Sequence, residues 1–348
     1  YRDMLNILKK IKKNNKQNKK IAFLIGNTSK SNYKKFYITP TREFNTVIIF
    51  GVIIFNISEA KNISKYIDGK VDYIFVDSEK KIKNILLKPK KIANIERTVK
   101  ENTKASRVVT YKGNDLTVEA LDLLISNLSE NNIRGIGGKK ITILGAGNLG
   151  SKIAIKLLER GGKIKLFRRN QQKLKTIIQM INLIKPKYTS EKIKYTNNLN
   201  TITKDSDFII GATDGSAVIT KKMIQNANKN IIIIDVGKGT LKQDAIQFAQ
   251  LQEIKIFRLD ITPALCGMVE SKIFFDTKFE KTIGIKTFGN ENLISGGIFA
   301  NKNDIIVDNI NKPRKVYGIS DGKGDIKKQL SKIDKIKINK IKKSLKIN

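Results

Sequence analysis

The sequence predicts an α/β protein of two domains, with an N-terminal α/β domain and then a doubly wound parallel sheet. Three observations favour this fold class. A chain of 348 residues exceeds one average domain and is long enough for two. Short runs rich in isoleucine, valine and phenylalanine are separated by helical patterns, as in a buried sheet. From residue 140 onward, strand and helix patterns alternate strictly, which is typical of a doubly wound parallel sheet.

The first part of the chain is predicted to form the domain that binds the substrate. Residues 1–20 are expected to form a basic helix or tail, and residues 21–114 an α/β catalytic domain. Apolar runs bounded by turn residues predict strands at 21–26, 35–39, 46–55 and 71–76, with a crossover helix at 58–67. A clear amphipathic pattern predicts a linking helix over 115–135, which Asn114 or Asp115 is expected to cap.

Residues 136–269 are assigned to the doubly wound domain. Strands are expected at 140–145, 163–167, 207–213, 230–235 and 255–260, with helices near 148–160, 170–184, 220–228 and 241–252. Residues 270–322 contain short strands, glycine pairs and polar turns, and are predicted to return and pack on the first domain. Residues 323–348 are expected to form a basic C-terminal helix or tail.

Composition limits the chemistry available to the chain. The single cysteine, Cys266, excludes a disulfide framework and a cysteine-clustered metal site. The absence of histidine excludes histidine nucleophile systems, histidine-ligated metals and a histidine general base, so no metal site is expected. Acid–base chemistry must therefore use Lys, Asp, Glu, Tyr or the thiol.

The net charge of +37 would suit a phosphate-rich partner, either nucleic acid or an anionic membrane. Only ten of the 68 basic residues are arginine, however, and the abundance of lysine, isoleucine and asparagine is what an AT-rich genome supplies for any function. Much of the excess lies in residues 1–20 and 323–348. We interpret the charge as solvated surface, and we expect a small-molecule substrate rather than nucleic acid as partner.

The longest apolar run, residues 47–55, is about half the roughly twenty residues that a membrane span needs. We therefore expect a cytoplasmic protein without a membrane partner, and a homodimer is left open. The chain begins at Tyr1 rather than methionine, which is compatible with a fragment or a removed leader.

The strongest motif is a glycine-rich GxGxxG sequence between a strand and a helix. Gly145 would make the tight turn, Gly147 would let the backbone approach a pyrophosphate, and Gly150 would let helix and strand pack closely. The helix N-terminus would offer free N–H groups to the phosphates. A glycine turn without a ligand is the alternative, but the context favours dinucleotide binding. The predicted cofactor-binding residues of the motif are Gly145, Ala146, Gly147, Asn148, Leu149 and Gly150.

The end of the next predicted strand favours NADP over NAD. An NAD site usually has an acidic residue about twenty positions after the motif, which binds the ribose hydroxyl. Here that place holds Arg168 and Arg169, two of only ten arginines in the chain. Guanidinium groups suit a 2′-phosphate, because they bind its oxygens in a fork.

Three further segments carry a family resemblance. The run from Phe167 to Leu174 resembles the "NRTxxKA" segment of shikimate/quinate dehydrogenases and glutamyl-tRNA reductases, with Arg169 and Lys173 at the family arginine and lysine. The run from Asp207 to Thr213 resembles their "DxxxxAT" strand, and its continuation to Asp235 is also similar to S-adenosylhomocysteine hydrolases. Residues 234–237 and 261–263 are similar to the "IDVG" and "ITP" segments of methylenetetrahydrofolate dehydrogenases.

The resemblance implies the amino-acid-dehydrogenase-like superfamily, with a catalytic α/β domain first and a Rossmann domain second. It further implies that the "AT" strand and the following loops lie beside the nicotinamide. On that basis Ala212, Thr213, Asp214, Val236 and Gly237 are predicted to bind the cofactor.

Departures from the individual families narrow this assignment. Glutamyl-tRNA reductases use an N-terminal cysteine, whereas the single cysteine here is Cys266. The hydrolases have an acid after the second Rossmann strand and a longer chain, and the folate enzymes lack a regular GxGxxG. Shikimate dehydrogenases use a Lys–Asp pair whose aspartate lies in an "NTD" segment before the linking helix, where this chain has Gly113-Asn114-Asp115.

A lysine–carboxylate pair suits ketone reduction, because an ammonium can protonate the developing alkoxide while a carboxylate orients it. Lys112 and Asp115 are the predicted catalytic pair, and each has a plain alternative: a solvated lysine and a helix cap. Asn114, Lys91 and Thr262 are predicted to bind substrate. Lys91 follows Pro89 roughly as the family lysine follows its proline, and Thr262 ends the last predicted Rossmann strand, at the ligand-binding edge.

The sequence therefore predicts an NADP-dependent oxidoreductase that transfers hydride to or from a keto, hydroxy, imine or amine group of a small polar or acidic molecule. Two alternatives stay open. One is an enzyme like S-adenosylhomocysteine hydrolase, which would copurify with tightly bound NAD. The other is a non-enzymatic cofactor sensor that holds nucleic acid through its basic tails, with an affinity that falls steeply with salt.

Overall fold

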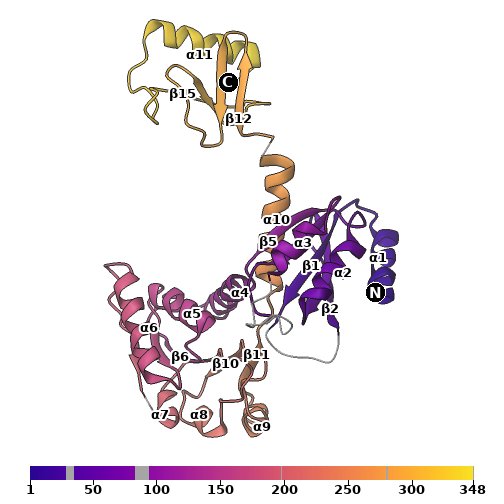
Figure 1. The fold of residues 1–348 in the computed structure, drawn as a ribbon. Helices are drawn as coiled ribbons and strands as arrows, with labels where there is room; N and C mark the ends of the chain where they lie inside the picture. Colours follow the sequence, from indigo (N-terminus) through magenta and orange to yellow (C-terminus); the bar gives the residue numbers. More distant parts are fainter. Residues whose placement is uncertain (29–34, 83–93, 197, 280, 348) are drawn as a thin grey trace. The chain divides into compact units, whose positions relative to one another are not determined.

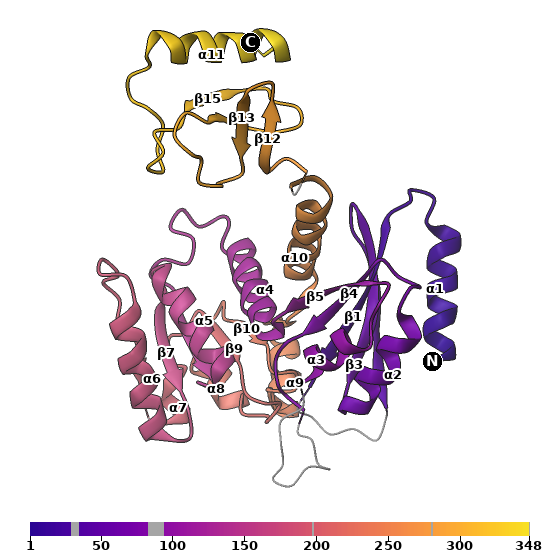
Figure 2. The ribbon, with the colours of Figure 1, turned by 45° about the horizontal axis from the view of Figure 1, so that its top comes forward.

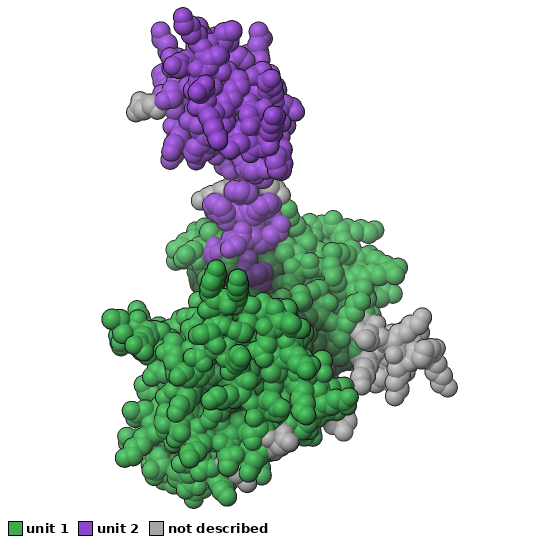
Figure 3. All heavy atoms as spheres, turned by 90° about the vertical axis from the view of Figure 1, so that its left-hand side faces the viewer, with its two compact units in different colours: residues 1–267 green, residues 268–348 purple. Residues whose placement is uncertain are grey.

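The chain divides into two compact units, Tyr1–Gly267 and Met268–Asn348, which Figure 3 shows in separate colours. The computed structural model describes residues 1–28, 35–82, 94–196, 198–279 and 281–347. The first unit contains two largely parallel sheets, and the second contains a smaller mixed sheet. Among the helices of these ranges, none is both long and apolar enough to cross a bilayer.

Five strands form the first sheet: β1 (Lys20–Asn27), β2 (Phe36–Glu43), β3 (Val47–Ile54), β4 (Tyr73–Asp77) and β5 (Arg107–Tyr111). Their order is β2-β3-β1-β4-β5, and every neighbouring pair is parallel except β2 with β3 (Figure 1). Strands β1 and β3 are almost wholly buried, which explains their continuous apolar sequences. Because the sheet is parallel from β3 to β5, the ends of β1, β4 and β5 lie at one edge.

Three helices accompany this sheet: α1 (Arg2–Asn14), α2 (Ile57–Ile67) and α3 (Ile95–Glu101). Met4, Leu8 and Ile11 of α1 belong to the same apolar core as the strands. The N-terminal segment is therefore a packed helix of the domain rather than a free tail, and its lysines occupy the opposite, exposed face.

Six parallel strands form the second sheet: β6 (Lys140–Leu144), β7 (Lys163–Phe167), β8 (Lys194–Tyr195), β9 (Phe208–Gly211), β10 (Ile232–Asp235) and β11 (Lys255–Arg258). Their order is β11-β10-β9-β6-β7-β8, which is the Rossmann order. The strand order reverses between β6 and β9, and ligands bind at such a switch point. The predicted fold class is confirmed.

The helices of this layer are α4 (Gly113–Leu128), which links the two sheets, and α5 (Asn148–Glu159), α6 (Gln171–Ile184), α7 (Leu199–Ile202), α8 (Lys221–Gln225) and α9 (Gln243–Leu251). Figure 2 shows α4 running beside α5. Helix α10 (Thr262–Phe274) follows β11 and continues into a short π-helix, η1 (Phe275–Phe279).

The second unit has a core of its own. Its strands are β12 (Gly284–Phe288), β13 (Glu291–Ser295), β14 (Ile305–Val307) and β15 (Val316–Ile319), paired in that order, with helix α11 (Lys332–Leu345). Side chains from β13, β14, β15 and α11 form one apolar cluster. The prediction that residues 270–322 pack on the first domain stays a prediction; within the second unit these strands pair with one another and bury apolar side chains under α11. The predicted basic tail of residues 323–348 therefore supplies a packed helix.

Helix α11 begins with a capping box. The Ser331 hydroxyl accepts from the Asp334 backbone N–H at 3.1 Å, and the Ser331 N–H donates to the Asp334 carboxylate at 3.0 Å. Lys327 Nζ lies 2.9 Å from the same carboxylate. The hydrogen bond from Lys327, followed by those from Ser331, lowers the pKa of Asp334 to about 2.

This lowered pKa predicts an acid-labile stability contribution in the second unit. A depressed carboxyl pKa stabilises the fold above the unfolded value, about 3.9, and the contribution is lost as the pH falls through the folded value. We expect Asp334→Asn to lower the free energy of unfolding near neutral pH, with the difference from wild type shrinking from about pH 4 down to about pH 2. Urea unfolding of both proteins from pH 7 to pH 2 measures this, and a difference independent of pH would contradict it.

Candidate functional site

A cavity of about 570 Å³ lies at the switch point of the Rossmann sheet. The glycine-rich turn, the end of β7 and the loop after β9 form its walls. Ten of the predicted cofactor residues line it: Gly145, Ala146, Gly147, Asn148, Leu149, Arg168, Arg169, Ala212, Thr213 and Asp214. The sequence reasoning missed six lining residues: Leu144, Phe167, Asn170, Leu199, Ser216 and Val218. Three of them directly flank predicted residues, and Ser216 and Val218 follow Asp214 closely, but Leu199 carried no signal because it comes from the separate helix α7.

The three motif glycines differ in what surrounds them. A Cβ on Gly145, which has φ +114°, would lie 2.6 Å from the Ala212 carbonyl oxygen, and one on Gly150 would lie 1.9 Å from the Gly145 carbonyl oxygen. These two glycines therefore allow the close packing of β6, β9 and α5. A Cβ on Gly147 would meet no heavy atom within 4 Å in the described parts of the chain. The space beside Gly147 is thus open, at a place where a ligand can approach the backbone.

Gly147 is also the N-cap of α5, and it brings no side chain to cap the helix. The first N–H groups of an α-helix have no partner within the helix, and they carry a partial positive charge. Helix α5 therefore presents anion-binding donors at the wall of the cavity. Both features, the open space and the uncapped helix, fit the pyrophosphate of a dinucleotide.

The two arginines at the end of β7 have different roles. The Arg168 guanidinium donates to the Ala146 carbonyl oxygen, and this bond ties β7 to the glycine-rich turn. Arg169 is exposed and lines the cavity. Arg168 thus supports the turn, and Arg169 presents the guanidinium that is most accessible to a ligand.

Three predicted cofactor residues lie outside the cavity lining. Gly150 is buried within the packing of α5. Val236 is buried, and a Cβ on Gly237 would lie 1.9 Å from the Thr213 carbonyl oxygen. Gly237 therefore packs behind Thr213, and it supports the lining loop without forming its surface.

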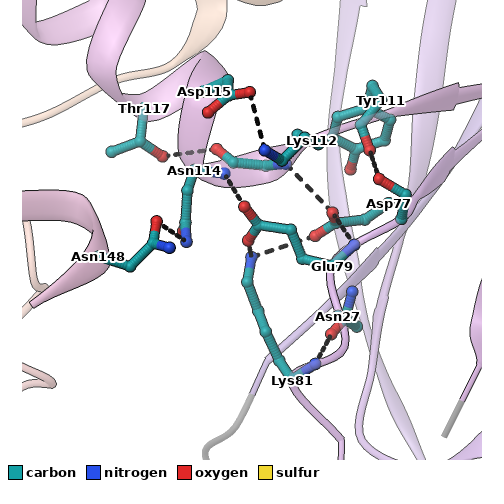
Figure 4. Close-up of polar contacts among 12 residues, drawn as sticks. Asn27, Asp77, Glu79, Lys81, Tyr111, Lys112, Asn114, Asp115, Thr117 and Asn148 are labelled. Atoms are coloured by element: carbon teal, nitrogen blue, oxygen red, sulfur yellow. Dashed lines mark hydrogen bonds and ion pairs between the residues drawn. The ribbon is translucent and has the colours of Figure 1, made fainter. Parts of the chain in front are cut away.

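A second group of polar residues lies at the carboxyl edge of the first sheet, where helix α4 begins (Figure 4). The Gly113 N–H donates to Asp77 at 3.1 Å, and the Asn114 N–H donates to Glu79 at 3.2 Å. Carboxylates from the end of β4 therefore cap α4, whose own N-cap, Lys112, makes no side-chain cap. The prediction that Asn114 or Asp115 caps this helix is wrong, and the Asp115 carboxylate is available for other contacts.

Lys81 lies between the two capping carboxylates. Its Nζ is 3.1 Å from Asp77 and 2.8 Å from Glu79. Burial alone would lower the pKa of Lys81, but the attraction of Asp77 and Glu79 outweighs it, and the pKa is raised. Burial, and then the negative charge of the same two carboxylates, raises the pKa of the Tyr111 phenol. The sequence analysis missed this network; its signal was acidic residues directly after a buried strand.

Asp115 contacts two ammonium groups. Lys112 Nζ lies 3.4 Å from its carboxylate, and Lys152 of α5 makes the closer contact. The hydrogen bond from Lys152 lowers the pKa of Asp115, and the same bond raises the pKa of Lys152. The structure therefore brings together the predicted pair Lys112 and Asp115, and adds Lys152, which the sequence analysis did not single out.

The linking helix and the Rossmann domain are held in register by charge. Three acidic residues of α4 pair with basic residues of α5 and its C-cap: Asp115 with Lys152, Glu119 with Lys156, and Asp122 with the C-cap Arg160. Successive members lie about one turn apart on each helix. At the end of this ladder, Asn114 Nδ2 lies 3.5 Å from Oδ1 of Asn148, which lines the cavity (Figure 4). The Asp115 group and the cavity are therefore neighbours.

One predicted substrate-binding residue, Thr262, is not part of this group. The Thr262 hydroxyl donates to Asp260 at 2.7 Å and accepts from Arg42 Nε at 2.7 Å. Thr262 thus joins the end of the Rossmann sheet to β2 of the first sheet. Lys91 lies outside the described residues. In the described ranges there is no cluster of three or more side chains suited to a metal ion.

Comparison with known proteins gives one family-model match and several partial relatives. Residues 127–260 match the shikimate / quinate 5-dehydrogenase family model. Over 102 residues the chain is 32% identical to the glutamyl-tRNA reductase of Thermosipho melanesiensis, a match covering 29% of this chain and 26% of the relative. Over 106 residues it is 31% identical to the glycerol-3-phosphate dehydrogenase (NAD(P)+) of Thermoanaerobacter sp. strain X514, covering 29% and 32%.

These matches span only about a quarter to a third of the curated relatives' length. Among solved structures, the chain resembles the L-tryptophan dehydrogenase of Nostoc punctiforme, with 15% identity, a TM-score of 0.41 and coverage of 67% of this chain and 64% of that one.

Proposed function

Because the chain carries a Rossmann domain of the amino-acid-dehydrogenase-like superfamily, we propose that it is an NADP-dependent oxidoreductase. Its substrate is a small polar or acidic molecule with a keto, hydroxy, imine or amine group. The observation that carries the proposal is the contact between Asn114 and Asn148. This contact supports the proposal because Asn114 is adjacent to Asp115 in sequence and Asn148 lines the cavity.

The residues at the cavity fit the cofactor. The open space at Gly147 and the uncapped start of α5 would hold the pyrophosphate. The exposed Arg169 would bind the 2′-phosphate, and Arg168 would keep the turn in shape through Ala146. Thr213 and Asp214 would lie towards the nicotinamide. When bound, NADP supplies the hydride chemistry.

Residues of the chain itself would supply the proton that the substrate oxygen needs during reduction. Reduction of a carbonyl builds negative charge on its oxygen, and an ammonium group can donate a proton there. Lys112 and Lys152 both contact Asp115. The Asp115 carboxyl is ionised at neutral pH, as an ordinary aspartate is, and the hydrogen bond from Lys152 lowers its pKa further, so the carboxylate would keep the two ammonium groups oriented. Asn114, at the start of α4, would bind a polar substrate group, and the two lysines would favour an anionic one.

Cofactor titration tests the proposal. We expect wild type to bind NADPH more tightly than NADH, and Arg168→Asp with Arg169→Ala to erase that preference. Arg169→Ala alone should weaken NADPH while leaving NADH nearly unchanged, because only NADPH carries the 2′-phosphate. Arg134→Ala, at an exposed arginine outside the cavity lining, is the matched control.

Fluorescence titration of the four proteins with both cofactors gives the result. Equal affinity of wild type for NADPH and NADH would overturn the choice of NADP. If the wild type bound neither dinucleotide, the proposal that the protein is an oxidoreductase would be overturned.

A further inference from the structure

A second cavity lies at the opposite end of the Rossmann sheet from the glycine-rich turn. Its volume is about 360 Å³, and the starts of β6 and β7 and the short edge strand β8 contribute to it. It shares no lining residue with the dinucleotide cavity. Five of its lining residues are lysines, with one apolar and two acidic neighbours: Lys140, Lys163, Lys165, Lys192, Lys194, Ile164, Glu191 and Asp205.

Strand register places these lysines next to one another. Lys140 is aligned with Lys163 on the neighbouring parallel strand, and Lys165 is aligned with Lys194. Lys163 and Lys165 are two residues apart on β7, so their side chains emerge on the same face of the sheet. Like charges held on adjacent strands repel one another, which costs stability unless an anion offsets the charge.

The acidic neighbours offset only part of this charge. Asp205 pairs with Lys140 at 3.6 Å, and Lys165 Nζ donates to the Lys204 carbonyl oxygen at 2.6 Å. Over the described residues, Lys163 and Lys194 take part in no ion pair. Burial, together with the positive charges of Lys140, Lys194 and Lys204, lowers the pKa of Lys165 despite the opposing charge of Asp205.

We propose that this cavity is a binding site for a small, free oligophosphate, an anion with several phosphoryl groups. Lysine ammonium groups bind phosphate as point charges, and several of them converge here on one concavity. A concave site of a few hundred Å³ suits a small ligand. The lining contains neither arginine nor an aromatic ring, the groups with which proteins usually stack and bind single-stranded nucleic acid.

The test uses the full chain and inorganic tripolyphosphate as probe, with calorimetry at about 150 mM salt, where diffuse surface attraction is screened. The variant Lys165→Gln with Lys194→Gln removes one aligned pair. The variant Lys12→Gln with Lys13→Gln removes the same charge from the exposed face of α1. We expect the first variant to lose at least tenfold in affinity and the second to match wild type. If the double variant does not fold, Lys194→Gln alone, on the edge strand, replaces it in the same titration and should also weaken binding.

Further titrations distinguish this site from the cavity beside the glycine-rich turn and from a nucleic-acid-binding surface. Tripolyphosphate should bind Arg169→Ala as it binds wild type, and NADPH titration should be unchanged in Lys165→Gln with Lys194→Gln. The pKa of Lys165, followed by NMR, should rise when tripolyphosphate binds. An equal loss in both lysine variants, or a loss in Arg169→Ala instead, would overturn the proposal. So would a single-stranded RNA that binds more tightly than tripolyphosphate and depends on the same lysines.

Discussion

Gly147→Ala should strongly weaken dinucleotide binding while leaving the fold nearly as stable as wild type. In the described structure a Cβ at this position meets no heavy atom within 4 Å, and the backbone, at φ −92° and ψ −163°, is open to any L-residue. The added methyl group would occupy the space that the proposed function assigns to the pyrophosphate. We expect NADPH affinity to fall about 100-fold, or about 2.7 kcal/mol. The free energy of unfolding should change by at most about 1 kcal/mol, the usual effect of losing a favourable N-cap residue.

Gly150→Ala is the contrasting variant. Its Cβ would lie 1.9 Å from the Gly145 carbonyl oxygen, so the backbone of the turn must move. This variant should lose stability together with cofactor affinity. Calorimetric titration and urea unfolding of both variants measure the two quantities. If Gly147→Ala bound NADPH with wild-type affinity, the proposal that the glycine-rich turn binds the cofactor would be contradicted.

Asp115→Asn should lower kcat by as much as about 10²–10⁴-fold, the usual contribution of general acid–base catalysis, because the lysines would lose the carboxylate that orients their ammonium groups. The neutral amide keeps the size of the side chain but no longer attracts the Lys112 and Lys152 ammonium groups. Substrate KM should change much less than kcat. The assay follows NADPH oxidation with a substrate found by screening small keto and hydroxy acids against wild type.

Asp122→Asn is the control for Asp115→Asn, because Asp122 belongs to the same ladder of ion pairs on α4 but pairs with Arg160 and Lys156. It should retain most of the activity. A second readout is independent of turnover: loss of the Asp115 carboxylate should lower the pKa of Lys152, which NMR of the lysine Nζ measures. Asp115→Asn with unchanged kcat would show that the carboxylate only joins the two helices.

The Rossmann half of the molecule was predictable because its signals are local. The β6 strand, the GxGxxG turn and the start of α5 follow one another within about a dozen residues, and a parallel sheet places such turns at one edge. Seven cofactor residues chosen this way line the cavity, as do three chosen from the family resemblance, although their binding of NADP stays a prediction. Local signals failed at α4, where asparagine and aspartate at the helix start resemble caps.

The site around α4 depends on partners far apart in sequence. Asp77 caps Gly113 across 36 residues, and Lys152 reaches Asp115 across 37. No spacing rule links such residues, since their distance depends on how the first sheet, α4 and α5 pack. The strand partners in the second unit depend on packing in the same way, because short strands with glycine turns do not indicate which sheet they join.

The sequence by itself determined most of the alternating strands and helices from residue 140 onward and the glycines of the turn, because each depends on the conformational preferences of a contiguous segment. Only the tertiary structure decided which charges meet: the carboxylates that cap α4, the second lysine on Asp115, and the lysines aligned across β6, β7 and β8. Electrostatic energy depends on distance in space, and chain folding alone sets that distance.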